Sequence, residues 1–314
     1  MVDGVTGVDG ADGLARPRDM SAGYGDGLGY GLSLGGGGLY FVAWQVAYLS
    51  RLAEAEVQVN GADRVVGTSA GSLVSSVLEA GNLGRLHKEL KVLSRLPRLL
   101  AVLAPSSDLF PSQIRARDLF GSAQNAEPEL VREIGRAALA AQAPAPSVMP
   151  RNIGLILASR RWPSAALHLT CVDTYTGERC VVTGTHGVKV ARAVAASSAV
   201  PGLFSPQPVL DRRCMDGGVS GSGVHLDLLA GASRAVVLCL SDGMGVEQGA
   251  MTVAPGSIMS EVEALQDTGT KVFFRTPESM DLDRLMDPAA VPDAIAMARR
   301  QADADAAELR TFLA

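Results

Sequence analysis

The sequence has few aromatic residues, no excess of positive charge and no long hydrophobic run. Aromatic residues make up 4% of its 314 residues, and 28 Lys and Arg stand against 33 Asp and Glu, giving a formal net charge of −5. Without surplus cations to neutralise phosphates, nucleic acid is not expected as the main partner. No uncharged apolar stretch reaches the ~20 residues that a membrane-spanning helix needs. We therefore expect a cytoplasmic globular protein with, at most, peripheral membrane contact.

Cysteine is also scarce. None of the four cysteines, Cys171, Cys180, Cys214 and Cys239, lies in a Cys-x-x-Cys pair, so neither a zinc site nor any other cofactor is indicated. Cys171 and Cys180 flank a predicted hairpin, where a disulfide is one interpretation. Reduced, buried thiols are the other, and the cytoplasmic expectation favours them. The abundance of Ala and Gly is typical of a GC-rich bacterial genome.

Two consecutive strand–turn–helix units open the predicted folded region. Residues 32–34 read as a strand that enters four glycines and a helix over 39–53, and residues 64–66 read as a strand before a tight turn and a helix over 72–80. Such units in succession predict an α/β fold with a parallel sheet and right-handed crossovers.

The rest of the chain extends this pattern. Residues 1–29 are rich in Gly and Asp and are predicted to be disordered, and residues 30–314 to form one domain. Residues 83–143 read as mostly helical and are expected to form an inserted cap. Within them, 85–103 mix leucines with cations, which fits a cap helix over a cleft or an interfacial helix on anionic lipid. Further strands are predicted over 166–173, 179–183, 209–215, 235–240 and 272–275, and helices over 188–196, 257–268 and 289–313.

The sharpest local signal is Gly67-Thr68-Ser69-Ala70-Gly71, a Gly-x-Ser-x-Gly sequence between a predicted strand and a predicted helix. A serine at such a strained turn projects its hydroxyl outward, and the flanking glycines, Gly67 and Gly71, avoid Cβ clashes. The N-terminus of the following helix favours developing negative charge. Ser69 is therefore a candidate nucleophile.

Glycines also end the first predicted strand and a later one. The backbone amides of Gly36, Gly37 and Gly38 form either a phosphate-binding loop or an oxyanion hole; Phe41 stands where the dinucleotide-binding pattern needs glycine, which favours the oxyanion hole. Asp216, followed by Gly217 and Gly218, is either an ordinary Asp-Gly turn or a carboxylate that accepts the serine proton.

Together these motifs resemble the patatin-like phospholipase family. The glycine run, the Gly67–Gly71 turn and Asp216-Gly217-Gly218 occur in the family's order, and residues 195–206 resemble its small-residue, Pro-Gly-Phe segment. The resemblance covers about residues 31–218 and the strand at 235–240. It implies a three-layer α/β/α sandwich with a mostly parallel central sheet and a Ser–Asp dyad that hydrolyses lipid acyl esters through an acyl-serine intermediate. Ser69 would be the nucleophile, Asp216 the base, and Gly36, Gly37 and Gly38 the oxyanion hole.

The sequence departs from the family pattern in two places, and one alternative site stays open. Tyr40-Phe41 stands where the family usually has a basic residue and glycine, and Ser220 to Gly223 replace its usual Asn and Pro. These changes leave the substrate class undecided. Ser69, Asp216 and His225 also follow the order of an α/β-hydrolase triad, which would act on small esters. A catalytically silent binding module of the same fold is the remaining alternative.

Overall fold

The computed structural model describes residues 19–93, 108–159, 161–243 and 256–314. In this part of the chain eight strands form one sheet with the pairing path β5-β6-β3-β2-β1-β7-β8, and β4 pairs with β3 outside this path. The strands are β1 (Gly31–Leu34), β2 (Arg64–Gly67), β3 (Leu167–Asp173), β4 (Arg179–Val182), β5 (Gln207–Val209), β6 (Arg212–Asp216), β7 (Arg234–Leu238) and β8 (Lys271–Arg275).

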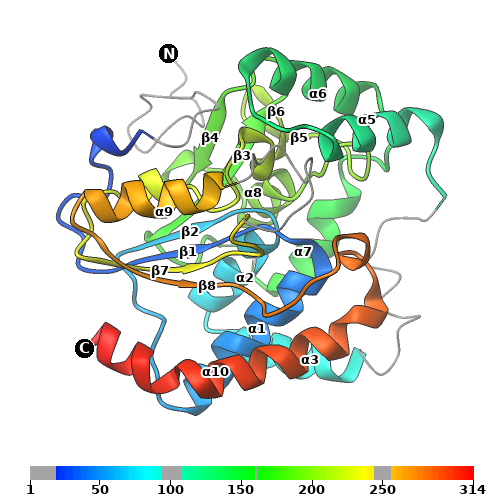
Figure 1. Ribbon diagram of the computed structural model, residues 1–314. Helices are drawn as coiled ribbons and strands as arrows, with labels where there is room; N and C mark the ends of the chain where they lie inside the picture. Colours follow the sequence, from blue (N-terminus) through cyan, green and yellow to red (C-terminus); the bar gives the residue numbers. More distant parts are fainter. Residues whose placement is uncertain (1–18, 94–107, 160, 244–255) are drawn as a thin grey trace.

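Strands β8, β7, β1, β2 and β3 run parallel, whereas β4, β5 and β6 form antiparallel pairs. Alternate side chains enter two different cores, as the period of a strand requires. Leu32 and Leu34 belong to the first core, and Val66 and Val237 belong to the second core, on the other face of the sheet. Both faces of the sheet are therefore covered, which confirms the predicted α/β/α sandwich (Figure 1).

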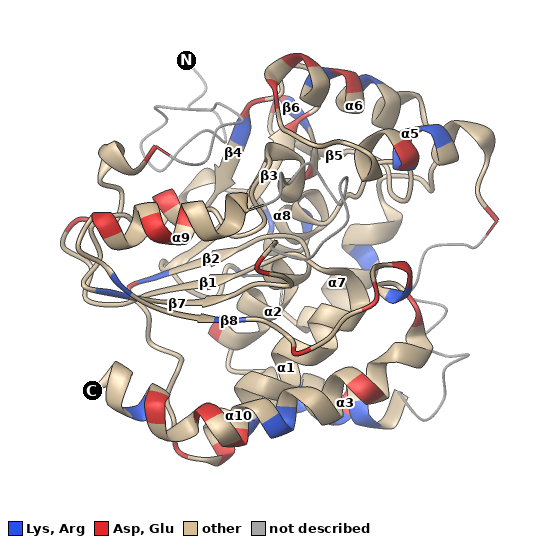
Figure 2. Ribbon diagram, viewed as in Figure 1, with Lys and Arg blue, Asp and Glu red and all other residues tan. Residues whose placement is uncertain are grey.

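Helices α1 (Gly38–Glu54), α2 (Ala70–Glu79), α3 (Leu83–Leu93), α7 (Val148–Leu157), α8 (Val190–Ser197) and α10 (Val291–Leu313) contribute to the first core. Helix α9 (Ser257–Asp267) covers the opposite face (Figure 1). Among the described helices, α1 and α10 pack against each other most extensively. Between them the Trp44 indole donates to Gln301 Oε1 at 2.9 Å, and the Tyr48 hydroxyl donates to Asp305 Oδ2 at 2.7 Å. Acidic and basic residues lie mainly on the outer faces of α9, α10, α3 and α6 (Figure 2).

The helices predicted as one cap lie in two places. Leu86 and Leu90 of α3 pack into the first core, whereas α5 (Pro111–Gly121) and α6 (Pro128–Ala140) pack on Val172 and Met215 at the opposite face. The interval is thus divided between two layers because its apolar stripes match two different sheet faces. The predicted helix over 85–103 is described only as far as Leu93, since residues 94–107 lie outside the described part of the chain.

Two other predictions need correction. Residues 19–29 pack on the domain: Met20 and Tyr24 contact the second core, and the Gly25 N–H donates to the Ala230 carbonyl at 2.7 Å. Residues 1–18 lie outside the described residues. The strand predicted over 209–215 is a hairpin of β5 and β6, because Leu210 adopts a left-handed conformation with φ 52° and reverses the chain.

Strands β2 and β6 lie along the same side of β3. Leu169 of β3 pairs with Gly67 of β2 on one side and with Val182 of β4 on the other. Two residues later, Cys171 pairs with Cys180 of β4 and with Asp216 of β6. Because β4 occupies one side throughout, β2 and β6 share the other, and they run in opposite directions. Their carboxyl ends therefore point at each other across a gap of two β3 residues, about 7 Å.

A buried ion pair ties the chain beyond β6 to the sheet. Arg179 at the start of β4 donates to both carboxylate oxygens of Asp227, at 2.8 and 2.7 Å, and both side chains have 0% exposure. We expect Arg179→Met to lower the free energy of unfolding by about 3–5 kcal/mol, because it leaves a buried carboxylate without its cation. Urea unfolding followed by circular dichroism measures this loss. The matched control is Arg299→Met, whose pair with Glu54 is 34% and 48% exposed and should matter far less. Equal losses in both variants would contradict the buried pair's importance.

Candidate active site

Ser69 lies between β2 and α2 in a backbone conformation that few non-glycine residues adopt, with φ 51° and ψ −117°. Its neighbours make this turn feasible. A Cβ at Gly67 would lie 2.8 Å from Ser72 Cα, and one at Gly71 would overlap the Leu34 carbonyl. Both glycines of the Gly-x-Ser-x-Gly sequence are therefore required by close backbone approach, as expected from the pattern.

Asp216 ends β6 and is buried beside the serine turn. Its Oδ1 accepts the Gly218 N–H at 2.8 Å. Burial raises the pKa of Asp216 to about 6, and the Ser69 side chain and the Gly218 amide oppose that rise. The contact with Ser69 is looser than a full hydrogen bond, since the buried Oδ2 has no hydrogen-bond partner among the described residues. Asp216 is thus a desolvated carboxyl group with one free oxygen near the serine.

The glycine run ends β1, the neighbour of β2, and so lies next to Ser69. A Cβ on Gly36 would sit 3.1 Å from Ser69 Cβ, tighter than most Cβ contacts, so a side chain at this position would push against the serine. The Gly36 N–H donates to the Gly223 carbonyl at 3.3 Å, which removes it from the three predicted oxyanion donors. No described residue accepts the N–H of Gly37 or Gly38, and Gly38 begins α1, where backbone N–H groups lack helical partners. The amides of Gly37 and Gly38 are therefore the two of the three predicted oxyanion donors that have no acceptor among the described residues.

Tyr40 and Phe41 stand at two positions where the sequence departs from the patatin-like pattern, and both lie in the helix that directly follows the glycine run. The Tyr40 hydroxyl donates to the Ser279 carbonyl at 2.6 Å, and its N–H donates to the Leu285 carbonyl at 2.9 Å. The Phe41 ring is fully buried and stacks on Trp44 with centroids 5.5 Å apart. The two Tyr40 hydrogen bonds therefore anchor this loop to the segment before α10, while the Phe41 ring packs within α1.

His225 does not join Ser69 and Asp216 in a hydrogen-bonded triad. The residue is fully buried in a left-handed conformation with φ 49°, and neither ring nitrogen has a hydrogen-bond partner among the described residues. Burial and the nearby Arg179 guanidinium hold the pKa of His225 well below its usual value. The imidazole is therefore neutral and makes no hydrogen bond to the carboxylate that a triad would require it to contact.

Two serines with no role predicted from the sequence contact the Ser69 backbone. Ser197 Oγ accepts the Ser69 N–H at 2.9 Å, and Ser198 Oγ donates to the Ser69 carbonyl at 3.0 Å. Ser72 Oγ donates to the same carbonyl at 2.6 Å. Their only signal in the sequence was their position in the small-residue segment over 195–206. Their partner is a backbone group, which no pattern of side chains can identify.

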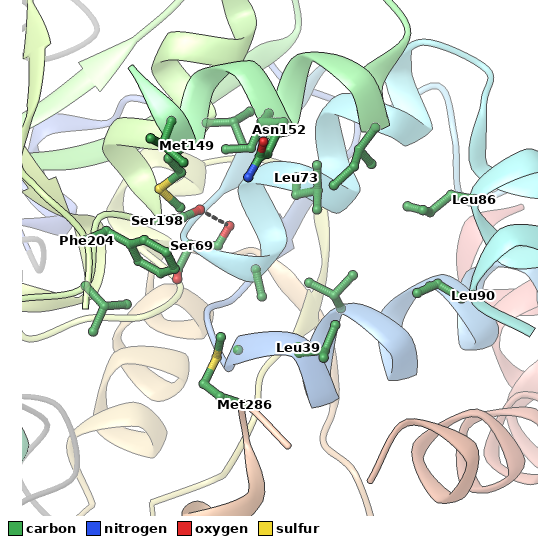
Figure 3. A pocket seen from close by; sticks show the side chains of 18 of the residues that line it. Leu39, Ser69, Leu73, Leu86, Leu90, Met149, Asn152, Ser198, Phe204 and Met286 are labelled. Carbon is green, nitrogen blue, oxygen red and sulfur yellow. Dashed lines mark hydrogen bonds between the residues drawn. The ribbon is translucent and has the colours of Figure 1, made fainter. Parts of the chain in front are cut away.

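An apolar pocket of about 410 Å³ opens beside Ser69. Ser69 lies at one end in Figure 3 and Leu86 and Leu90 of α3 at the other, with side chains of α1, α2 and α7 between them. Glu89 is the one charged side chain among the described lining residues. The other principal lining residues are Leu39, Val42, Leu73, Leu93, Met149, Asn152, Ile153, Ile156, Val194, Phe204 and Met286. The pocket has the size and character of a site for an apolar ligand.

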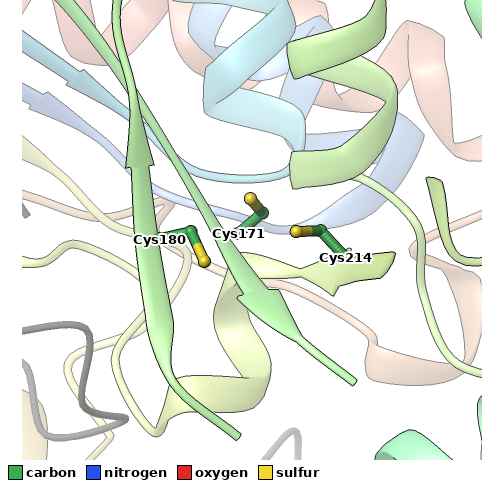
Figure 4. Close-up of side chains that lie close together, drawn as sticks. All are labelled: Cys171, Cys180 and Cys214. Carbon is green, nitrogen blue, oxygen red and sulfur yellow. The ribbon is translucent and has the colours of Figure 1, made fainter. Parts of the chain in front are cut away.

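The described residues include one cluster of potential metal ligands, formed by three cysteines. The sulfur atoms of Cys171, Cys180 and Cys214 lie within 4.8 Å of one another on adjacent strands (Figure 4). All three are buried free thiols, so Cys171 and Cys180 form no disulfide. They pack within the first core, where free cysteines behave as small apolar side chains. We assign no metal to them.

Comparisons with known proteins identify the fold of this site. The family model described as patatin-like phospholipase matches residues 32–230. No curated protein matches the chain. Among solved structures, the type III effector protein ExoU is similar with 18% identity and a TM-score of 0.32 over 88% of this chain. VipD from Legionella pneumophila is similar with 12% identity and a TM-score of 0.36 over 87% of this chain.

The chain spans 53% of the ExoU chain and 66% of the VipD chain. The family model carries the identification instead, because it covers the serine turn, the glycine run, Asp216 and the segment between them. This protein belongs to the patatin-like phospholipase family.

Proposed function

We propose that this protein is a lipid acyl hydrolase in which Ser69 and Asp216 form a catalytic dyad. The observation that carries the proposal is the pair of strand ends that brings the Ser69 hydroxyl beside a buried carboxyl group with a free oxygen. Family membership supports ester hydrolysis in general. The roles of the individual residues rest on their geometry.

In the proposed reaction Ser69 Oγ attacks the ester carbonyl carbon while Asp216 Oδ2 accepts the hydroxyl proton. The N–H groups of Gly37 and Gly38 stabilise the resulting oxyanion, a contribution typically worth about 3–4 kcal/mol for one donor. Collapse of the tetrahedral intermediate breaks the ester C–O bond, and Asp216 returns the proton to the departing alcohol. Asp216 then accepts a proton from the water that attacks the acyl-serine. It returns this proton to Ser69 Oγ as the acyl C–O bond breaks and the carboxylic acid is released.

The pocket favours an ester whose acyl chain is apolar. Its walls are leucine, isoleucine, valine and methionine side chains, and it starts at the nucleophile. An acyl chain lying along α1, α2 and α7 toward α3 would place its carbonyl at Ser69. We therefore propose long-chain acyl esters, of the phospholipase A and carboxylesterase kind, as the substrate class. Peripheral contact with a lipid surface would deliver such substrates.

Replacing the nucleophile tests the proposal first. Ser69→Ala is expected to reduce hydrolysis of a p-nitrophenyl acyl ester by at least about a thousandfold, because the acyl-serine can no longer form. Thermal unfolding should stay close to that of the wild type. Full activity of the Ser69→Ala variant would show that Ser69 is not the nucleophile.

The triad alternative is tested by His225→Asn, because asparagine tolerates the left-handed conformation of this position. The dyad predicts that this variant keeps most of its activity once its folded state is verified. A loss of activity as large as that of Ser69→Ala would favour the triad. If the protein is instead a binding module without turnover, the wild type itself should hydrolyse no ester.

The pH dependence of kcat/KM should reflect Asp216. The carboxylate must be ionised to accept the proton, and burial raises the pKa of Asp216 to about 6. Activity should therefore be low below pH 5 and rise to a plateau above pH 7, with a midpoint near 6. A midpoint near 4, the ordinary aspartate value, would mean that the titrating base is exposed and is not Asp216.

The same pKa predicts an effect on stability. The raised folded-state pKa means that stability falls as pH rises from about 4 to about 6, since the folded protein holds this proton more tightly than the unfolded chain. Asp216→Asn removes that cost. Its melting temperature should exceed that of the wild type at pH 8 and match it near pH 4. A variant that is equally stable or less stable at pH 8 would contradict the desolvated carboxylate.

A further inference from the structure

We propose that residues 197–199 act as a positioning segment that holds Ser69 and Asp216 at their working separation. The proposal rests on the dyad proposed above and adds three residues to it. Ser197 Oγ accepts the Ser69 N–H at 2.9 Å, Ser198 Oγ donates to the Ser69 carbonyl at 3.0 Å, and the Ala199 carbonyl accepts the Asp216 N–H at 3.0 Å. Three consecutive residues thus contact the backbones of both members of the dyad.

The sheet alone fixes this separation only indirectly. Strands β2 and β6 do not pair with each other; each pairs with β3, and their ends meet in the gap between them. Ser69 lies two residues beyond β2, outside the β2–β3 register, in a backbone conformation that needs support from its surroundings. A direct connection from Ser69 to Asp216 therefore has to come from outside the ladder, and residues 197–199 supply it.

The segment is stiff enough for this role. Ser197 is the last residue of α8, and the next three residues continue its hydrogen bonding: Ser198 N donates to Val194 O at 3.0 Å, Ala199 N to Ala196 O at 3.2 Å and Val200 N to Ser198 O at 2.9 Å. Ser197 and Ala199 have 0% exposure, so water does not compete for their contacts. A displacement of α8 would move both dyad residues.

The two sides of the Ser69 peptide are held unequally. Its N–H has Ser197 Oγ as its one side-chain acceptor among the described residues, whereas its carbonyl receives hydroxyl groups from both Ser198 and Ser72. Loss of Ser197 leaves the amide without a partner, but loss of Ser198 leaves the 2.6 Å bond from Ser72 in place. The proposal therefore predicts a large loss of kcat when the Ser197 hydroxyl group is removed. It predicts a small loss when either Ser198 or Ser72 alone is changed, because the other hydroxyl group still donates to the Ser69 carbonyl.

Steady-state kinetics with a p-nitrophenyl acyl ester test this pattern. Ser197→Ala should lower kcat by about 10- to 100-fold, the scale expected for a displaced catalytic group, and leave KM within about twofold. Ser197→Thr keeps the hydroxyl group and should restore most of kcat. Ser198→Ala and Ser72→Ala should each cost about threefold or less, and the double variant should cost clearly more than their product, because each replaces the other.

The matched control is Ser76→Ala. Ser76 is 1% exposed in the same helix as Ser72 and donates to the Ser72 carbonyl at 2.7 Å, without touching the Ser69 peptide. This variant should lose thermal stability comparably to Ser197→Ala and keep kcat. The proposal is overturned if Ser197→Ala keeps kcat, if Ser76→Ala loses as much kcat at an equal melting temperature, or if the effects at 72 and 198 simply multiply.

The failure of this proposal is separable from failure of the dyad. Should Ser69→Ala be inactive while Ser197→Ala is fully active, the dyad stands and the positioning segment is rejected. Should Ser69→Ala itself stay active, the dyad is wrong. If Ser197→Ala does not fold, the Ser72 and Ser198 single and double variants decide the outcome by their coupling, because none of them removes the hydroxyl group that accepts the Ser69 N–H.

Discussion

The contact between a serine at the end of β2 and a buried carboxyl group at the end of β6 is the feature on which the rest of the structure depends. Two strands that run toward each other along one side of β3 leave a gap of two residues between their carboxyl ends; Asp216 ends one strand, and Ser69 lies two residues beyond the other. The parallel neighbour β1 ends beside it and adds the glycine run. An entirely parallel sheet would place the carboxylate in a neighbouring strand position and not opposite the serine.

Stability is sacrificed at several points of this arrangement. Ser69 adopts a strained backbone conformation, and Asp216 is buried without a full set of hydrogen bonds. The surroundings offset these costs: the 0%-exposed pair of Arg179 and Asp227 fixes the chain beyond β6, and Tyr40 anchors the glycine run. Desolvation that destabilises the ionised Asp216 also makes it a stronger base near neutral pH. The features that weaken the fold locally are therefore those that the proposed proton transfer would use.

Much of this was predictable from the sequence where a residue type answers a strict local demand. Gly67 and Gly71 are needed because backbone approaches them closely, and the two strand–turn–helix units follow from short apolar runs and their breakers. The reversal at Leu210 was not predictable, because a leucine gives no turn signal and only tertiary packing holds it at positive φ. The division of residues 83–143 between two layers was missed for a related reason: an apolar stripe shows that a helix packs but not against which face.

The contacts of Ser197 and Ser198 were not predictable from the sequence either. Their partners are the peptide groups of a residue more than 120 positions earlier, and a backbone group has no sequence signature. The departure at Tyr40 and Phe41 likewise becomes interpretable only when the carbonyls of Ser279 and Leu285 lie within reach. The central claim is that Ser69 is the residue that becomes acylated. Peptide mapping by mass spectrometry after treatment with a fluorophosphonate tests it most directly: the account predicts a single adduct on Ser69, and stoichiometric labelling of any other residue, or none in an active enzyme, would contradict it.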